Sequence, residues 1–275
     1  AVPAALGLAR QPKRGWDSVT VPGAVAGWAA LHGKLGKLPF EELFEPAIEI
    51  AERGYAVPPV VAHKWAAAED ELRDQPGFAE AFLPQGHAPR VGDKFRFPDA
   101  ARTLRLIARS KGRDYYEGEL AERMVAFSAQ CGAALTLDDL RSYRPEWVQP
   151  IAKDYRGYTL NEIPPNGQGI AALIALGILE QFDVAGLPVD SAQSQHLQIE
   201  AMKLAFADLY RYVADPRSMA VTPEQMLDDG YLAERARLID PNRATHFAAG
   251  RPHAGGTIYL TAADESGMMV SFCLL

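Results

Sequence analysis

The feature that most constrains this chain is an unbroken apolar run at residues 169–179. The run is shorter than the about 20 residues that a membrane-spanning helix needs. It follows residues 164–169, which read PPNGQG, and such a rigid, glycine-rich stretch is typical of a turn that leads into a helix. We therefore expect a turn here, then a helix over residues 170–181, and no membrane span.

The composition is that of an ordinary soluble globular protein. Hydrophobic residues make up 48%, charged residues 23% and aromatic residues 9% of the 275 residues, which excludes disorder, collagen and coiled coil as the main architecture. The length predicts one large domain or two modest ones. A formal net charge of −7 argues against a nucleic-acid-binding surface. Cys131 and Cys273 lie among apolar neighbours, so we expect buried thiols rather than a disulfide framework.

The two ends of the sequence suggest that it is part of a longer polypeptide. The chain begins AVPAAL, without an initiating methionine, a basic segment or an apolar signal segment, which predicts a mature or trimmed start. It ends on apolar residues 270–275, which predict a strand. We therefore expect a piece of something larger. Cytoplasm and periplasm both stay open as its location, because a removed signal would leave the same sequence.

Local patterns predict helices through most of the chain and strands at its end. The segments expected to be helical are residues 24–31, 40–53, 101–108, 115–129, 170–181 and about 192–213, with two more helices that start at the capping residues Thr136 and Thr222. Gly54 is the expected C-cap of the helix over residues 40–53, and residues 190–193, which include Ser191, can cap the long helix. Strands are expected at residues 19–23, 258–263 and 268–275, with a hairpin turn at residues 264–267 between the last two. Residues 151–163 predict a strand, a turn at Arg156 and Gly157 and a second strand, and a loop is expected at residues 74–97. This order favours an α+β fold over a regular βαβ alternation.

Most of the candidate sites have an ordinary structural explanation. The histidines form neither an i, i+4 pair nor a cluster with cysteines, so no metal site is predicted, and His196 fits a helix histidine better than a base. Residues 164–169 could hold an anion ahead of a helix, but they lack the lysine of a P-loop, and a tight turn is favoured. Asp208, Arg211 and Asp215 share one helix face, which predicts exposed ion pairs.

The most informative stretch is GGTIYL at residues 255–260. Here Gly255 and Gly256 precede Thr257 at the start of a predicted strand, as self-cleaving N-terminal-nucleophile enzymes require. A threonine hydroxyl is a weak nucleophile, but the freed α-amine of a terminal threonine can take its proton. Gly256 has no Cβ, which lets the peptide adopt the conformation that attack on its carbonyl requires. The pattern alone still favours an ordinary strand threonine after a Gly-Gly turn.

Further segments place this stretch in a wider pattern. Residues 20–28 read TVPGAVAGW and residues 154–158 read DYRGY, followed by PPNGQG at 164–169. AFAD at residues 205–208 and YVADP at residues 212–216 come next, and GTIYLT at residues 256–261 comes last. In this order, over nearly the whole chain, the segments resemble the γ-glutamyltransferase (γ-glutamyltranspeptidase) family of N-terminal-nucleophile hydrolases, which also holds cephalosporin-acylase-like members.

The resemblance implies that Thr257 is the autoprocessing residue and, once the Gly256–Thr257 bond is cleaved, the catalytic nucleophile. It implies the four-layer αββα sandwich of these hydrolases, incomplete in this chain. Residues 1–256 would be the large-subunit portion and residues 257–275 the first strands of the small subunit. The implied partner is the small subunit of the same precursor, in a heterodimer or a dimer of heterodimers. No metal or organic cofactor is implied, and the substrate contacts would lie beyond Leu275, so no substrate-binding residue is predicted.

Three functions stay open at this point. The first hypothesis is a threonine-nucleophile amidohydrolase or acyltransferase that cleaves γ-glutamyl amides such as glutathione. The second is an acylase that removes glutaryl-type side chains from a β-lactam nucleus, because glutaryl and γ-glutamyl groups differ by one α-amino group. The third is an unprocessed precursor or scaffold that binds a partner chain and does no chemistry. Neither a nucleic acid nor a membrane is an expected partner.

Overall fold

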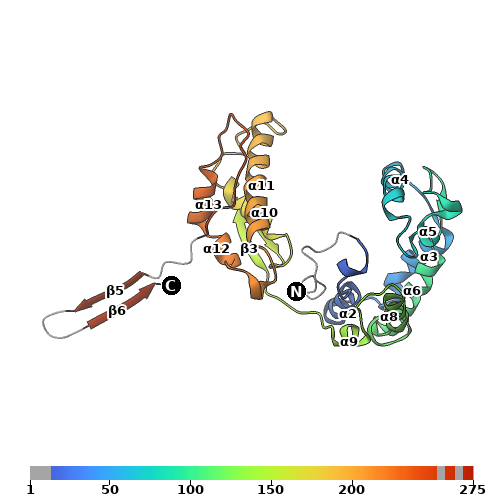
Figure 1. Ribbon diagram of the computed structural model, residues 1–275. Coiled ribbons are helices and arrows are strands. Elements are labelled where there is room, and N and C mark those ends of the chain that lie inside the picture. Colours follow the sequence, from blue (N-terminus) through green and yellow to red (C-terminus); the bar gives the residue numbers. More distant parts are fainter. Residues whose placement is uncertain (1–13, 253–257, 264–268, 275) are drawn as a thin grey trace. The chain divides into compact units, whose positions relative to one another are not determined.

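The apolar run forms helix α10 (Ile170–Leu179) in the computed structural model, at the centre of the core of the chain's second half. Ile170, Leu173, Ile174 and Ile178 are completely buried. The helix packs against α11 (Ala192–Tyr212) and α13 (Asp229–Ala236), which cover it in Figure 1. Among the described residues, no helix is both long and apolar enough to cross a membrane. The predicted helix is thus confirmed as a core helix.

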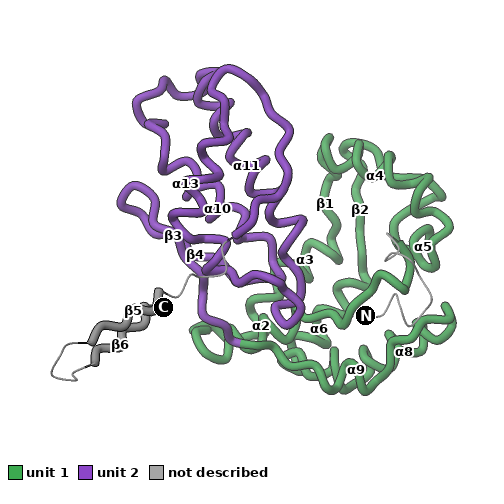
Figure 2. Tube along the Cα trace, turned by 60° about the vertical axis from the view of Figure 1, so that its left-hand side comes forward, with its two compact units in different colours: residues 1–146 green, residues 147–275 purple. Residues whose placement is uncertain are grey.

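The structure describes residues 14–252 in full and the backbone of residues 258–263 and 269–274. The chain divides into two compact units, residues 1–146 and residues 147–275, which Figure 2 shows in green and purple. Each unit has its own buried apolar residues.

The second unit begins with a hairpin of β3 (Ile151–Tyr155) and β4 (Tyr158–Glu162). The strands pair antiparallel, from Ile151 opposite Glu162 to Tyr155 opposite Tyr158. The two turn residues, Arg156 at φ 49° and Gly157 at φ 86°, both take positive φ, as the two-residue turn that suits a twisted hairpin requires. The predicted strand–turn–strand is confirmed.

Three short elements follow α11 in this unit. They are η4 (Pro216–Ser218), α12 (Pro223–Met226) and α13. Ser191 caps α11 by accepting a hydrogen bond from the backbone N–H of Ser194, and Thr222 forms a capping box with Gln225. Both helix starts were predicted from these residues. Gly177 of α10 leaves room for Leu232 of α13, since a Cβ at position 177 would collide with that side chain.

The first unit is built mainly of helices. Its elements are η1 (Trp16–Ser18), α2 (Ala24–Leu35), η2 (Glu41–Phe44), α3 (Glu45–Arg53), β1 (Tyr55–Ala56), α4 (Pro59–Leu72), α5 (Phe78–Phe82), η3 (Pro84–Gly86), β2 (Lys94–Phe95), α6 (Pro98–Ser110), α7 (Arg113–Glu117), α8 (Glu119–Gln130) and α9 (Leu137–Ser142). The main core gathers around Phe40, Phe44, Ile107 and Leu140. Gly54 ends α3 at φ 82°, and Thr136 caps α9 through a capping box with Asp139, as predicted.

The prediction of a strand at residues 19–23 was wrong. A side chain takes the place of a partner strand there: the Tyr116 hydroxyl donates to the carbonyl of Pro22 at 2.7 Å. The same hydroxyl accepts from the backbone N–H of Ala26 at 3.1 Å. Tyr116 therefore holds an extended lead into α2 without any strand pairing.

Two predicted boundaries in this unit were also wrong. The expected loop at residues 74–97 contains α5, η3 and β2, because Trp65, Phe82 and Phe95 form a small aromatic core that orders it. The expected single helix at residues 115–129 is divided into α7 and α8. The Asp114 carboxylate accepts from the backbone N–H groups of Glu119 and Leu120, each at 3.2 Å, and so caps a new helix start after Gly118.

The last strands are β5 (Ile258–Ala263) and β6 (Met269–Leu274), an antiparallel pair in which Ile258 lies opposite Leu274. Their predicted turn at residues 264–267 and the predicted end residues Met268 and Leu275 lie outside the described residues. Across the described part of the chain, the strands form three two-stranded antiparallel sheets and most other residues are helical or in connections. Cys131 carries a free, half-buried thiol, so it is less buried than predicted, and the Cys273 side chain lies outside the description.

The buried position of α10 leads to a stability prediction. Ile174→Ala should lower the free energy of unfolding by about 2–5 kcal/mol, because it removes buried methyl and methylene groups and leaves a cavity. Ile199→Ala is the matched control: Ile199 lies in α11 and is 56% exposed, so its replacement should change stability by about 0.5 kcal/mol or less. Urea titrations of the full-length variants compare the two. Equal losses would contradict the assignment of α10 as the core helix.

Candidate functional site

The predicted cleavage residues Gly256 and Thr257 lie outside the described residues, as do Gly255 and His253. The described chain leads up to them at Pro252, which is buried, and continues after them at Ile258, where β5 begins. The described site therefore consists of the groups that hold the chain on the two sides of these residues.

One row of side chains on α11 holds residues 240–250, which begin with a turn at residues 240–243 and contain no helix or strand. The ring Nε2 of His196 lies 2.7 Å from the carbonyl oxygen of Asp240. Four residues further on, a carboxylate oxygen of Glu200 accepts from the backbone N–H of Thr245 at 2.9 Å. Asp208 and Tyr212 continue the row and bind Gly250. The four residues of the row are separated by four, eight and four positions. Multiples of four slightly exceed whole turns of about 3.6 residues, so the row winds around α11.

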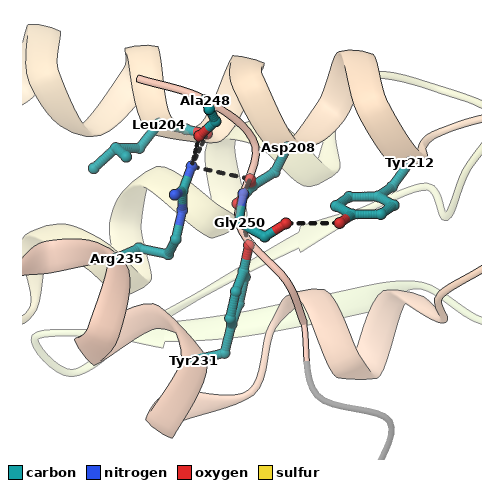
Figure 3. A network of polar contacts seen from close by, with 7 residues as sticks. All are labelled: Leu204, Asp208, Tyr212, Tyr231, Arg235, Ala248 and Gly250. Atoms are coloured by element: carbon teal, nitrogen blue, oxygen red, sulfur yellow. Dashed lines mark hydrogen bonds and ion pairs between the residues drawn. The ribbon is translucent and has the colours of Figure 1, made fainter. Parts of the chain in front are cut away.

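Asp208 is the centre of this arrangement, and Figure 3 shows its contacts. Its carboxylate is fully buried, at 0% exposure, and accepts from the Tyr231 hydroxyl at 2.7 Å. It also accepts from the Arg235 guanidinium at 3.0 Å and from the backbone N–H of Gly250 at 2.7 Å. A buried charge is tolerated where it is paired and hydrogen-bonded, and Asp208 meets both conditions.

Arg235 and Tyr212 complete the hold on the segment. The Arg235 side chain is buried and also donates to the carbonyl of Ala248 at 2.9 Å, while the Tyr212 hydroxyl donates to the carbonyl of Gly250 at 2.6 Å. Gly250 is thus bound at both its N–H and its carbonyl. A Cβ at this position would collide with the Tyr231 hydroxyl, so glycine suits it. We call Asp208, Tyr212, Tyr231 and Arg235 the clamp.

The environment of the clamp keeps Tyr231 protonated. Burial raises the pKa of the Tyr231 hydroxyl far above its usual range, and its hydrogen bond to the Asp208 carboxylate raises that pKa further. Removing the proton would place a second negative charge beside Asp208 in an apolar setting, which is why both effects act in the same direction. Tyr231 therefore acts as a hydrogen-bond donor and not as a base.

Glu200 is a second buried carboxylate on the same helix. Burial alone would raise its pKa, but hydrogen bonds from Lys203 and from the backbone N–H of Thr245, together with the charge of Lys203, outweigh this and lower the pKa below its ordinary value of 4.5. The Lys203 ammonium lies 2.6 Å from the carboxylate. Glu200 therefore stays ionised and keeps its hold on Thr245 at neutral pH.

The prediction of exposed ion pairs among Asp208, Arg211 and Asp215 was wrong for Asp208, which is buried and pairs with Arg235. Arg211 lies over the ring of Tyr212 instead, with its guanidinium carbon 5.9 Å from the ring centroid. Asp215 does form an ion pair at the surface, with Arg217 at 2.7 Å. Hydrogen bonds from the Arg217 side chain and backbone lower the pKa of Asp215 to about 2.

Tyr231, Arg235 and Gly250 were not predicted from the sequence. A signal for the first two was present in the spacing: Tyr231 and Arg235 are four residues apart, and each is followed by a buried residue, Leu232 and Ala236. Residues at this spacing share a helix face, so an arginine on an apolar face predicts a buried partner. Gly250 offered no such signal, because its role depends on a helix that is distant in the sequence.

The glycine-rich lead into α10 has the geometry of a turn. The carboxylate of Glu162 lies against Gly169 at the start of the helix, where a Cβ would collide with it. An acidic side chain therefore already occupies the position at which the helix N-terminus would attract an anion. This arrangement accords with the turn that was favoured from the sequence.

Neither a metal cluster nor the apolar cavity of the first unit gives a second candidate within the described residues. No group of three His, Cys, Asp or Glu side chains there could hold a metal ion. A cavity of about 720 Å³ lies in the first unit and is lined by rings such as Trp65, Phe78 and Phe95, with Lys64 beside them. Its lining includes no carboxylate, histidine, serine, threonine or cysteine, so it lacks a nucleophile–base pair.

Comparison with known proteins identifies the family. The profile of the family named Gamma-glutamyltranspeptidase matches residues 4–274. The chain belongs to the gamma-glutamyltranspeptidase family. The match includes Gly256 and Thr257 and both sides of the site described above.

Individual gamma-glutamyltranspeptidase relatives match over nearly the whole chain. A glutathione hydrolase-like YwrD proenzyme of Bacillus subtilis is 36% identical over 95% of this chain and 50% of its own length. An oxamate amidohydrolase proenzyme of Klebsiella pneumoniae is 37% identical over 95% of this chain and 50% of its own length. The solved structure of a cephalosporin acylase from Bacillus halodurans is 45% identical, with a TM-score of 0.83 over 98% of this chain and 51% of that chain. The chain spans about half the length of the curated relatives it matches.

The lowered pKa of Glu200 predicts a pH dependence of stability. Because this pKa is lower in the folded chain than in the unfolded chain, ionised Glu200 stabilises the fold above the unfolded-state value, and the contribution is lost as the pH falls through the folded-state pKa. Glu200→Gln should therefore lower the melting temperature at about pH 7 and have a smaller effect near about pH 3. Thermal unfolding at a series of pH values measures this. A deficit that stays constant across the series would contradict a role for the charge.

Proposed function

We propose that the full protein is a threonine-nucleophile amidohydrolase or acyltransferase that matures by cleaving its own Gly256–Thr257 bond. The observation that carries the proposal is the family match, which covers residues 4–274 and so includes Gly256 and Thr257. The start of β5 at Ile258 supports it, because Thr257 then directly precedes a strand in the sequence, as the terminal nucleophile of the proposed small subunit would.

Maturation follows from the chemistry of the two residues. The Thr257 hydroxyl oxygen attacks the carbonyl carbon of Gly256, and the Gly256–Thr257 C–N bond breaks as an ester to the threonine oxygen forms. The proton lost by the hydroxyl passes to the departing threonine nitrogen. Water then hydrolyses this ester, which leaves Gly256 with a carboxylate and Thr257 with a free α-amine. That amine is the base that the hydroxyl needs for turnover.

Turnover repeats the same attack on a substrate amide. The hydroxyl oxygen of Thr257 forms an ester with the acyl group as the amine leaves, with a proton delivered to that amine. Water or an acceptor amine then cleaves the ester and restores the hydroxyl. These steps use a hydroxyl, an amine and water, so we propose no metal or organic cofactor.

The subunit organisation is part of the proposal. Residues 1–256 form the large-subunit portion, and residues 257–275 begin a small subunit whose remainder is supplied by the same precursor. Since the chain spans about half the length of its relatives, that remainder would complete a four-layer αββα sandwich and supply the oxyanion and substrate contacts. A heterodimer, or a dimer of heterodimers, is the proposed assembly.

A γ-glutamyl amide of the glutathione type is our first substrate proposal, supported by the family and by the glutathione hydrolase-like relative. A second candidate is a glutaryl amide on a β-lactam nucleus. It is favoured by one observation, the 45% identity to a cephalosporin acylase over 98% of this chain. The two acyl groups differ by one α-amino group, so a single cation-binding contact would decide between them.

Replacement of the nucleophile tests the proposal directly. Intact-mass spectra of the full-length gene product should show two chains for the wild type, with the smaller beginning at Thr257. Thr257→Ala should stay whole and inactive, because it has no hydroxyl. Thr257→Ser keeps the hydroxyl and serves as the matched control, so it should still be cleaved.

The same experiment distinguishes the enzyme hypothesis from the scaffold hypothesis. A non-catalytic scaffold or unprocessed precursor would stay whole as the wild type, and Thr257→Ala would then change neither its mass pattern nor its binding of a partner. A wild-type protein that is cut at another bond would also contradict the assignment of Thr257.

A pair of assays chooses between the two substrates. Matured protein should release p-nitroaniline from γ-glutamyl-p-nitroanilide at least about tenfold faster than from glutaryl-p-nitroanilide, because a site built to bind the α-amino group loses a polar contact with the glutaryl analogue. The ratio of kcat/KM values is the measurement. A ratio below one, with the glutaryl substrate cleaved faster, would favour the acylase.

A further inference from the structure

The proposed cleavage bond lies in a short connection between two hydrogen-bonded elements. The clamp binds the chain at Ala248 and Gly250, and β5 starts its pairing with β6 at Ile258. Gly256 and Thr257 therefore follow the last clamped residue by six and seven positions in the sequence. The hold on Gly250 sets where and in which direction this connection begins.

The clamp holds the segment by its backbone. It makes three hydrogen bonds to backbone groups of residues 248–250: Arg235 to the Ala248 carbonyl, Gly250 N–H to Asp208, and Tyr212 to the Gly250 carbonyl. Two of these involve ionised side chains, and such bonds are roughly twice as strong as neutral ones. They restrain both position and peptide orientation, since they engage an N–H and a carbonyl of the same residue.

Self-cleavage is sensitive to this kind of restraint. The hydroxyl must approach the carbonyl carbon of the preceding residue along a narrow path, and each residue of an unrestrained connection has conformational entropy that has to be lost before attack. Anchoring one end of a short connection removes part of that entropy in advance. The clamp stands at the upstream end of this connection.

We propose that Asp208, Tyr212 and Arg235 are positioning residues for autoprocessing: they anchor residues 248–250 on α11 and α13 so that the Gly256 carbonyl is presented to the Thr257 hydroxyl. The proposal rests on the proposed function, since it concerns the same cleavage. It assigns a role in maturation to the AFAD and YVADP segments, whose Asp208 and Tyr212 belong to the clamp.

Tyr212→Phe is the sharpest test, because it removes one hydroxyl and keeps the ring. Asp208 variants would leave Arg235 buried without its partner and could fail to fold. Tyr210→Phe is the matched control: it makes the same change two residues away on the same helix, at a side chain that is 77% exposed and stacks on Phe206. Both variants are made in the full-length chain.

The readout is the half-time of precursor cleavage after a pulse of cell-free synthesis, followed by intact mass. Tyr212→Phe should lengthen it about threefold to tenfold, the effect expected of one lost hydrogen bond, while Tyr210→Phe should match the wild type. In a Thr257→Ala background, which stays uncut, the melting temperatures of the Tyr212→Phe and Tyr210→Phe chains should agree within about 2 °C.

Three outcomes would overturn the proposal. If wild-type protein is cut at Gly256–Thr257 and Tyr212→Phe is cut equally fast, the clamp does not position the bond and the proposed function stands. If slower cleavage comes with a melting temperature several degrees lower in the uncut background, Tyr212 supports stability and not positioning. If the wild type is not cut at Gly256–Thr257, the proposed function fails, and the positioning role fails with it.

Discussion

The buried pair of Asp208 and Arg235 is the interaction on which the arrangement of the second unit depends. It joins α11 to α13 at 3.0 Å, and the same two side chains bind residues 248 and 250. Removing one partner of such a pair typically costs about 3–5 kcal/mol, because the other charge is left uncompensated in an apolar interior. Tyr231 adds a further hydrogen bond to Asp208 and keeps its proton there. The pair thus restricts how α11, α13 and the segment of residues 248–250 can pack together.

Apolar burial and this polar pair have separate roles in the same unit. Helix α10 contributes apolar burial, which has no preferred direction. Its completely buried Leu173, Ile174 and Ile178 need only be covered by other apolar side chains. The hydrogen bonds from α11 to residues 240–250 fix how this segment is oriented on the helix, because hydrogen bonds have defined donors, acceptors and angles. A segment with little regular structure of its own is thereby held along α11.

The sequence predicted those elements whose cause is local. The helix at α10, the β3–β4 turn at Arg156 and Gly157, and the caps at Thr136, Ser191 and Thr222 all depend on residues close together in the chain. The wrong predictions concern segments where a side-chain hydrogen bond, and not the local sequence pattern, decided the backbone structure. Tyr116 replaced a partner strand for residues 19–23, and Asp114 began a new helix within a pattern that looked continuous.

The sequence by itself determined the family and the candidate nucleophile, because motifs such as TVPGAVAGW, DYRGY and GTIYLT are strings of neighbouring residues that can be read in order. It also placed Asp208 on a helix, but with the wrong surroundings. Only the tertiary structure decided that Asp208 is buried, that its partner is Arg235, and that Gly250 is bound between Asp208 and Tyr212. These contacts join residues 27, 42 and 38 positions apart. Charge alone does not predict which of many basic residues pairs with Asp208 at such separations. The packing of the apolar helices determines which side chains meet.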